Sequence, residues 1–366
     1  MMISKARALY VHVPFCRSIC SYCDFCHKPY QSDLAAQWLN AIETELSSFR
    51  FTEQIETIYL GGGTPTALSF AQLERLLALL DPYTAQVREY TCEINPETLD
   101  EDKAQLLKDH GVNRASIGYQ TDDKELLKLM NRHHDAHSVN NTMALLRSKG
   151  INNISLDLMY SLPGQTMASL KQSVHTAIAM KPDHLSLYSL TIEPGTLFAL
   201  KHLDHLDEDT EADMYEWIMQ ELPKHGYHQY EISNFALPGK ESLHNQMYWN
   251  YQDFAGIGCG ASGKEGTYRY DHTKDVMTYL KDPCAILKTE LSEQDQMFEA
   301  LMMGLRLRKG LNRHIFKDMF GKDINEVWPD IIAREMENCM LAESEDALYA
   351  TDRGFEILND VLEDFL

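Results

Sequence analysis

The sequence predicts an α/β fold whose main part is an open, partial barrel of parallel strands. Short apolar runs rich in β-branched and aromatic residues alternate with stretches of helical periodicity, and this alternation occurs six times before about residue 200. The composition, with 44% hydrophobic and 24% charged residues, is that of an ordinary globular protein. Each crossover helix returns the chain to start a parallel neighbour, and six units are too few for a closed eight-fold barrel.

The elements follow in a regular order. Strands are predicted at residues 9–13, 57–60, 90–94, 114–119, 154–159 and 184–192, and helices at residues 34–49, 70–80, 100–110, 124–130, 138–149 and 167–180. In the first helix, apolar residues recur every three or four positions from Leu34 through Trp38, Ile42 and Leu46 to Phe49, which gives one buried face. Glycines that follow a last turn with Lys or His mark helix ends, and these are Gly111, Gly150 and Gly226.

The pattern changes after about residue 200. Residues 204–213 form an acidic helix start, and residues 226–266 are dense in Gly, Tyr, Asn and His without clear periodicity. A helix with an apolar face begins at Ser292, and a small hairpin is predicted around residues 347–350. We therefore expect a barrel at residues 1–200, an irregular α+β extension at 201–290 and a small, mainly helical C-terminal domain at 291–366.

The charge balance excludes some classes of function. Lys and Arg number 33 against 55 Asp and Glu, which gives a net charge of −22. Such a surface repels phosphates and anionic lipids, so we expect no nucleic-acid binding, although a locally basic site could hold a small anion. The N-terminus lacks the apolar core of a signal peptide, and no run of 18 apolar residues occurs. We expect a cytoplasmic protein without an integral membrane segment, whose eight cysteines do not form a disulfide framework.

A cluster of cysteines gives the first functional indication. Cys16, Cys20 and Cys23 follow the first strand with three and then two residues between them. Three thiolates on one tight loop can bind three irons of a 4Fe–4S cluster and leave the fourth iron open to a small chelating ligand. A structural zinc site is the alternative, and Cys26 or His27 would supply its fourth ligand. Buried, unreactive cysteines are less consistent with the charged and polar residues of this loop.

The run from Tyr10 to Phe25, which carries the three cysteines, resembles the radical S-adenosylmethionine (SAM) superfamily, and within it the coproporphyrinogen III oxidase–like branch. This resemblance implies a partial (β/α)6 barrel, in agreement with the six units counted above. It also implies that Cys16, Cys20 and Cys23 hold a 4Fe–4S cluster and that SAM chelates the open iron. Reduction of that complex can then yield a deoxyadenosyl radical.

Polar residues and glycines stand where the predicted strands end. A tight turn or a cap is the ordinary explanation for such residues. For Asn95, which precedes Pro96, a turn residue and a ligand contact are equally consistent with the sequence. The resemblance instead implies SAM contacts from Tyr10, Tyr22, Gly62, Gly63, Thr64, Glu93, Gln120, Arg132 and Asp157. His133 and His134, which follow Arg132, are expected on the surface.

A second motif lies in the extension, where His244-Asn245 is followed by Tyr248-Trp249. A lone histidine is usually structural or exposed, but His is a good axial ligand for heme iron, and aromatic rings can stack on a flat macrocycle. Together with residues 230–235, this element resembles the HemW heme-chaperone family. The resemblance implies that His244 binds heme.

Two features separate this family from the oxygen-independent decarboxylase of the same branch. Only 15 residues precede Cys16, whereas the decarboxylase carries a substantial N-terminal extension. The decarboxylase also has a fourth cysteine two residues after the third, where this chain has Phe25. The extra cysteine, Cys26, departs from the usual chaperone pattern too and is interpreted as incidental.

Three functions therefore stay open. The resemblance favours a heme chaperone that hands heme to an acceptor, for example a respiratory heme protein, with a dimer as one state. The rival is an oxygen-independent coproporphyrinogen III oxidase, in which a SAM-derived radical abstracts hydrogen from propionate side chains. The third is a zinc module on an unrelated α/β protein.

Overall fold

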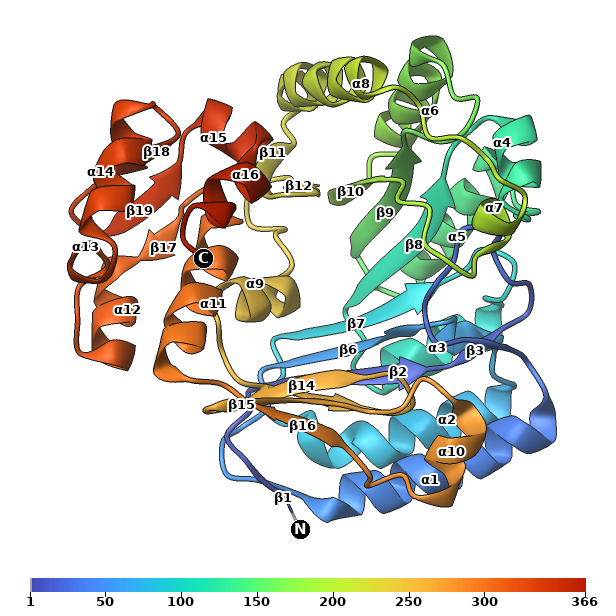
Figure 1. Cartoon of the computed structure of the whole chain (residues 1–366). Helices are drawn as coiled ribbons and strands as arrows, with labels where there is room; N and C mark the ends of the chain where they lie inside the picture. Colours follow the sequence, from blue (N-terminus) through green and yellow to red (C-terminus); the bar gives the residue numbers. More distant parts are fainter. Residues whose placement is uncertain (1) are drawn as a thin grey trace.

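The computed structural model describes residues 2–366 and confirms the α/β fold with six strand–helix units (Figure 1). Six parallel strands form the middle of a twelve-stranded sheet, in the order β10-β9-β8-β7-β6-β2. Their bounds are β2 (Ala8–Val13), β6 (Thr57–Gly62), β7 (Glu89–Ile94), β8 (Arg114–Gln120), β9 (Asn153–Tyr160) and β10 (His184–Ser189). All five neighbouring pairs among them are parallel, as expected for strands joined by crossover helices.

Helices of the predicted kind join these strands. They are α1 (Ser32–Ser48), α2 (Phe70–Leu80), α3 (Glu101–Asp109), α4 (Lys124–Leu129), α5 (Ala136–Ser148) and α6 (Met167–Ala179). The apolar face of α1 is buried as expected, with Trp38 and Ile42 fully inside the core. Gly111, Gly150 and Gly226 have φ of 88°, 83° and 85°, the left-handed conformation of glycines that end helices.

Two short strand pairs support the barrel. Strand β1 (Met2–Ser4) pairs in parallel with β5 (Phe49–Phe51). Strand β3 (Phe15–Cys16) pairs in parallel with β4 (Lys28–Pro29), so the two ends of the cysteine loop are held side by side. The loop is therefore a closed structure attached to the end of β2.

The extension differs from the irregular segment that the sequence predicts. After the short helix α7 (Leu197–Leu200), the extension contains α8 (Glu208–Glu221), β11 (His228–Glu231), β12 (Asn234–Ala236), α9 (Leu243–Trp249), β13 (Phe254–Ile257), β14 (Ser262–Glu265), β15 (Tyr268–Asp271), α10 (Val276–Lys281) and β16 (Leu287–Glu290). Strand β12 pairs antiparallel with β10, and β13 pairs in parallel with β2, so the extension covers both edges of the central strands (Figure 1). Its buried apolar residues, such as Phe235 and Ile257, share one core with the barrel.

These strands show no clear periodicity in the sequence because each has only three or four residues, and β13 and β14 also contain a glycine that close contacts require. A Cβ on Gly263 of β14 would lie 2.2 Å from Cζ of Tyr270, and a Cβ on Gly256 of β13 would lie 1.8 Å from the carbonyl oxygen of Ser262. Glycine at these positions lets the strands pack closely but removes the alternation of apolar and polar side chains on which prediction depends.

The C-terminal residues form a second core beside the extension (Figure 1). The elements are α11 (Glu293–Leu305), β17 (Leu311–Asn312), α12 (Arg313–Phe320), α13 (Ile324–Val327), α14 (Pro329–Glu337), β18 (Leu341–Glu343), β19 (Ala347–Ala350), α15 (Asp352–Glu356) and α16 (Leu358–Glu363). Ser292 caps α11 as the sequence predicts, and the hairpin of β18 and β19 is joined by β17. No helix within residues 2–366 is long and apolar enough to cross a membrane.

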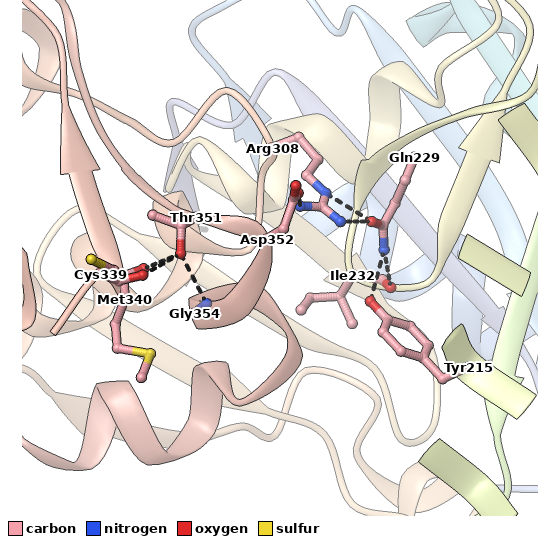
Figure 2. Close-up of polar contacts among 9 residues, drawn as sticks. All are labelled: Tyr215, Gln229, Ile232, Arg308, Cys339, Met340, Thr351, Asp352 and Gly354. Atoms are coloured by element: carbon pink, nitrogen blue, oxygen red, sulfur yellow. Dashed lines mark hydrogen bonds and ion pairs between the residues drawn. The ribbon is translucent and has the colours of Figure 1, made fainter. Parts of the chain in front are cut away.

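Polar contacts connect this second core to the extension (Figure 2). The Arg308 guanidinium donates to Oε1 of Gln229 on β11 and to Asp352, which begins α15. Gln229 in turn donates to the carbonyl oxygen of Ile232 and to the hydroxyl of Tyr215 on α8. One arginine therefore connects the C-terminal helices to two elements of the extension.

Candidate functional site

A pocket of about 480 Å³ lies at the carboxyl ends of the parallel strands. This is the end of a parallel sheet at which ligands bind in related architectures. The pocket brings together eleven of the thirteen residues that the sequence analysis singled out, namely Cys16, Cys20, Tyr22, Cys23, Gly62, Gly63, Thr64, Glu93, Gln120, Arg132 and Asp157. Tyr10 and His244 do not line it.

The cysteine loop is fixed over the pocket by backbone contacts to the chain that follows β8. The amide of Ser21 donates to the carbonyl oxygen of Met130 at 3.0 Å, and Asn131 Nδ2 donates to the carbonyl oxygen of Ile19 at 2.8 Å. The amide of Cys23 donates to the carbonyl oxygen of Cys20 at 3.2 Å, which closes a turn. The loop thus has a defined shape in which the three thiols are half-buried.

The three thiols are not grouped as the ligands of a single ion would be. In the part of the chain that the structure describes, Cys16, Cys20 and Cys23 do not belong to any group of three or more His, Cys, Asp or Glu residues whose ligand atoms all lie within 4.8 Å of one another. A single zinc ion needs its ligands closer together, whereas a cubane separates its irons. Of the two candidates for a fourth zinc ligand, Cys26 has its Sγ atom 3.2 Å from that of Cys259, whereas His27 has its Nδ1 atom 3.6 Å from Cys23 Sγ.

The glycine segment at the end of β6 approaches the cysteine loop as closely as a backbone can. A Cβ on Gly63 would lie 2.7 Å from the carbonyl oxygen of Phe15 and 2.9 Å from Sγ of Cys16. Gly62 has φ of 106°, a conformation that other residues rarely adopt. The hydroxyl of Thr64 lies 3.8 Å from Cys16 Sγ. The segment therefore presents backbone groups to whatever fills the pocket, as a ligand cradle does.

Two carboxylates face the pocket from neighbouring elements. Glu93 accepts hydrogen bonds from the Tyr59 hydroxyl at 2.9 Å and from the Gly62 amide at 3.1 Å. Asp157 accepts from the Ser116 hydroxyl at 3.0 Å. Burial raises the pKa of Glu93 to about 7, and the nearby Asp157 charge adds to this rise. Burial also raises the pKa of Asp157.

This raised pKa predicts a pH dependence of stability in protein free of cluster and SAM. The protonated form of Glu93 is favoured in the folded state. Its contribution to the unfolding free energy is therefore complete below pH 4.5 and is lost as the pH rises through 7. The unfolding free energy of the parent should fall by about 3 kcal/mol over this range, and Glu93→Gln should remove most of that fall. Urea unfolding at several pH values measures both. Glu97→Gln, at an exposed position, is the control. An unchanged slope in Glu93→Gln would contradict the assignment.

Gln120 and Arg132 are held in unusual environments. Gln120 has φ of 66° and ends a bulge in β8, which turns the chain toward the pocket. Arg132 NH2 donates to the Tyr22 hydroxyl at 3.4 Å, while Arg132 Nε is buried and finds no hydrogen-bond partner among residues 2–366. A Cβ on Gly118 would lie 3.1 Å from Arg132 NH2. A buried guanidinium with an unpaired N–H beside three thiols suits an anionic occupant.

His244 lies away from this pocket, at the opposite ends of the strands. Its Nδ1 is 2.9 Å from the hydroxyl of Thr57, the first residue of β6, and its Nε2 is 2.7 Å from the hydroxyl of Tyr248. Its amide donates to Glu89, the first residue of β7. The ring is 1% exposed, and burial lowers its pKa to about 3. In this conformation both ring nitrogens are engaged by hydroxyl groups.

Two other expectations need adjustment. Tyr10 does not itself line the pocket: its hydroxyl bonds His12 Nδ1 at 2.9 Å, and its ring lies against Tyr59, which does line it. His134 is not a surface residue: it is 5% exposed, and its Nε2 lies 2.9 Å from the carbonyl oxygen of Tyr119. His133 is exposed as expected.

The pocket also contains residues that the sequence analysis missed. Ser116, Met159 and Tyr188 line it from β8, β9 and β10, and Tyr59 lines it from β6. Alternate side chains of a strand lie on the same face of the sheet. Counting in steps of two from Asp157 along β9 would have indicated Met159, and counting from Gln120 along β8 would have indicated Ser116. Tyr188 is 42% exposed, which is unusual for an aromatic residue in a central strand.

Comparison with known proteins agrees with this geometry. The family model of the radical SAM superfamily matches residues 10–177, and that of the HemN C-terminal domain matches residues 291–357. The chain is 38% identical to the heme chaperone HemW of Lactococcus lactis over all of this chain and 98% of that protein. The chain belongs to the HemW family. Its identity to HemW of Bacillus subtilis is 37%, over 98% of this chain and 99% of the relative.

The resemblance drawn from the cysteine loop and the His244 element is thus confirmed at the level of the family. HemW from Escherichia coli is 32% identical over 98% of both chains. Among solved structures, the coproporphyrinogen III oxidase HemN of Escherichia coli aligns with a TM-score of 0.86 at 23% identity, covering 99% of this chain and 90% of that one. This likeness shows a shared fold.

Proposed function

We propose that this member of the HemW family is a heme chaperone that binds heme and transfers it to an acceptor protein. The observation that carries the proposal is the full-length similarity to heme chaperones, at 38% and 37% identity. The cysteine loop, the glycine segment and the His244 element support it because each occurs here with its motif complete. The proposal includes a cytoplasmic location, a heme-acceptor protein such as a respiratory heme protein, and a dimer as one state.

The pocket residues fit a 4Fe–4S cluster and SAM. Cys16, Cys20 and Cys23 would hold three irons, and the unpaired Nε of Arg132 is available to an anionic group beside them. Gly62 and Gly63 line the pocket and let its wall pack closely against His12 and the cysteine loop, and the carboxylate of Glu93 can accept from an ammonium or hydroxyl group. When bound, the cluster supplies an electron that can cleave the sulfonium of SAM. The remaining SAM contacts proposed are Tyr10, Tyr22, Thr64, Gln120 and Asp157.

Heme binding through His244 requires a change in α9. Both ring nitrogens are occupied, and Nε2 is the one held from within α9 itself, by Tyr248. Glu89 fixes the start of the helix by accepting from the amides of Leu243 and His244. We therefore propose that heme iron takes Nε2 after the Tyr248 hydroxyl is released, which leaves Nδ1 oriented by Thr57, as the second nitrogen of a metal-bound histidine usually is.

Two substitutions test this site by opposite effects. His244→Ala should weaken heme binding by more than about tenfold, because it removes the iron ligand. Tyr248→Phe should strengthen it, by roughly threefold to tenfold, because it removes the hydrogen bond that iron must displace. Absorbance titration with hemin measures both, and His133→Ala at an exposed position is the matched control.

The pair of outcomes is decisive. If His244→Ala binds heme as tightly and stoichiometrically as the parent, the proposed site is wrong. If His244→Ala weakens binding but Tyr248→Phe leaves it unchanged, His244 acts through the packing of α9 and is not the ligand.

The rival activity is tested by turnover. Cluster-reconstituted protein is given SAM, a reductant and coproporphyrinogen III without oxygen, and the porphyrins and deoxyadenosine are separated by chromatography. The chaperone proposal expects no decarboxylated porphyrin while spectroscopy shows an intact cluster. Formation of protoporphyrinogen over many turnovers would overturn the chaperone proposal and make the protein a biosynthetic enzyme.

A further inference from the structure

Cys26 and Cys259 lie side by side although they are far apart in the sequence. Cys26 ends the cysteine loop, and Cys259 follows β13 in the extension. Their Sγ atoms are 3.2 Å apart. A disulfide bond is about 2.05 Å long, so the two sulfurs need to approach by only about 1 Å. Cys259 is fully buried and Cys26 is 6% exposed, which leaves Cys26 as the sulfur that a small oxidant reaches first.

The surrounding backbone holds the two thiols in this arrangement. Cys259 Sγ is 3.1 Å from the carbonyl oxygen of Thr273, and Cys26 Sγ is 3.1 Å from the carbonyl oxygen of the next residue, Lys274. A Cβ on Gly260 would lie only 2.5 Å from Cβ of Cys26, so a glycine is needed there for Cys26 to come this close. Two consecutive carbonyls and one glycine thus place both thiols together.

The pair is separate from the ligands assigned to the cluster. Cys23 and His27, on either side of Cys26, line the pocket, whereas Cys26 does not. Its carbonyl oxygen is 2.8 Å from His12 Nε2, which fixes the backbone of the loop end against β2. The interpretation of Cys26 as incidental therefore misses a contact that only the folded chain creates.

We propose that Cys26 and Cys259 are a redox-active pair that forms a reversible disulfide with hydrogen peroxide as the oxidant. The Cys26 sulfur attacks one peroxide oxygen, the O–O bond breaks, hydroxide leaves and Cys26 becomes a sulfenic acid. The Cys259 sulfur then attacks the Cys26 sulfur, breaks its S–O bond and releases a second hydroxide. The two thiol protons convert both hydroxides to water, so the sulfurs lose two electrons and the peroxide gains them.

The bond would tie the end of the cysteine loop to the extension. Because β13 pairs with β2, the loop end would then be fixed to the central sheet by a covalent link. It would hold the loop in place when the cluster is lost, and it would remove a spare thiol that competes with Cys16, Cys20 and Cys23 for iron. This inference goes beyond the proposed function, and its test needs neither heme nor SAM.

The test uses the full chain, with and without its cluster, treated with one equivalent of hydrogen peroxide in the absence of oxygen. Free thiols are then alkylated, and tryptic peptides are mapped by mass spectrometry. We expect the thiol count to fall by two from the eight of the reduced chain, with a cross-linked pair of peptides, 18–50 and 241–264, that dithiothreitol separates. In the cluster-free chain the disulfide should raise the unfolding temperature by several degrees.

Matched variants identify the partners. Cys26→Ser and Cys259→Ser should each abolish the cross-link, while Cys92→Ser, at another buried cysteine, should retain it. In the cluster-bound chain, the iron content should stay unchanged while the cross-link forms. The proposal is overturned if Cys26 pairs with Cys20 or Cys23, if Cys26 is oxidised beyond sulfenic acid while Cys259 stays reduced, or if the exposed Cys339 is oxidised and no cross-link forms.

Discussion

Replacing Cys20 by serine is expected to abolish the 4Fe–4S cluster of this protein. Cys20 lies in the middle of the loop, and its thiol lines the pocket beside those of Cys16 and Cys23. Loss of an outer-shell partner costs a metal site about 10–100-fold in affinity, so loss of one of three direct ligands should cost more than about 100-fold. Iron and sulfide analysis of anaerobically reconstituted protein, with the absorbance of the cluster, measures the effect.

The control for this experiment is Cys92→Ser, which removes a buried thiol of β7 outside the pocket lining and should leave the iron content at the parent level. Circular dichroism distinguishes loss of the cluster from loss of the fold, since the loop is held by backbone bonds such as Ser21 to Met130 that do not involve the Cys20 side chain. A Cys20→Ser protein with a full complement of iron and sulfide would contradict the assignment of the three cysteines. Zinc in the parent protein would instead favour the structural-zinc alternative.

The sequence contained enough information to predict the barrel because each of its strands and helices carries its own pattern. In α1, the recurrence of Trp38, Ile42 and Leu46 corresponds directly to the buried face. Most of the pocket was predicted through the resemblance to the radical SAM superfamily, which the motifs of the cysteine loop carry. The glycines and polar strand ends agree with it, because a parallel sheet brings strand ends of one kind to one edge.

The rest depends on contacts between distant segments. Strand β13 is four residues long, and its register is set by pairing with β2, which no local pattern reveals. His244 lies in a recognisable motif, but the motif does not reveal that the hydroxyls of Thr57 and Tyr248 bond to its two ring nitrogens in the buried site. The approach of Cys26 to Cys259 likewise needs Gly260, whose role is visible only once the extension is folded onto the loop.

One buried carboxylate contributes to the attachment of the extension to the barrel. Glu45 is fully buried on α1 and accepts hydrogen bonds from the amide of Gly258 at 3.1 Å and from the hydroxyl of Tyr279 at 2.6 Å. Its other oxygen is 2.9 Å from Nε2 of His272, whose side chain is 1% exposed. Gly258, His272 and Tyr279 all belong to residues 254–281, the part of the extension that covers β2.

Glu45→Ala should therefore lower the unfolding free energy by about 3–5 kcal/mol, because it leaves the buried amide of Gly258 and the buried hydroxyl of Tyr279 without their common acceptor and removes the carboxylate that faces His272. Urea unfolding measures this change. Glu43→Ala on the same helix is the matched control: Glu43 pairs with Arg75 at 2.7 Å where both side chains are exposed, so its loss should cost less than about 1 kcal/mol. Glu45→Gln keeps an acceptor oxygen and should fall between the two. If Glu45→Ala were no more destabilising than Glu43→Ala, the carboxylate would not hold the extension, and strand pairing and the shared apolar core would account for its attachment.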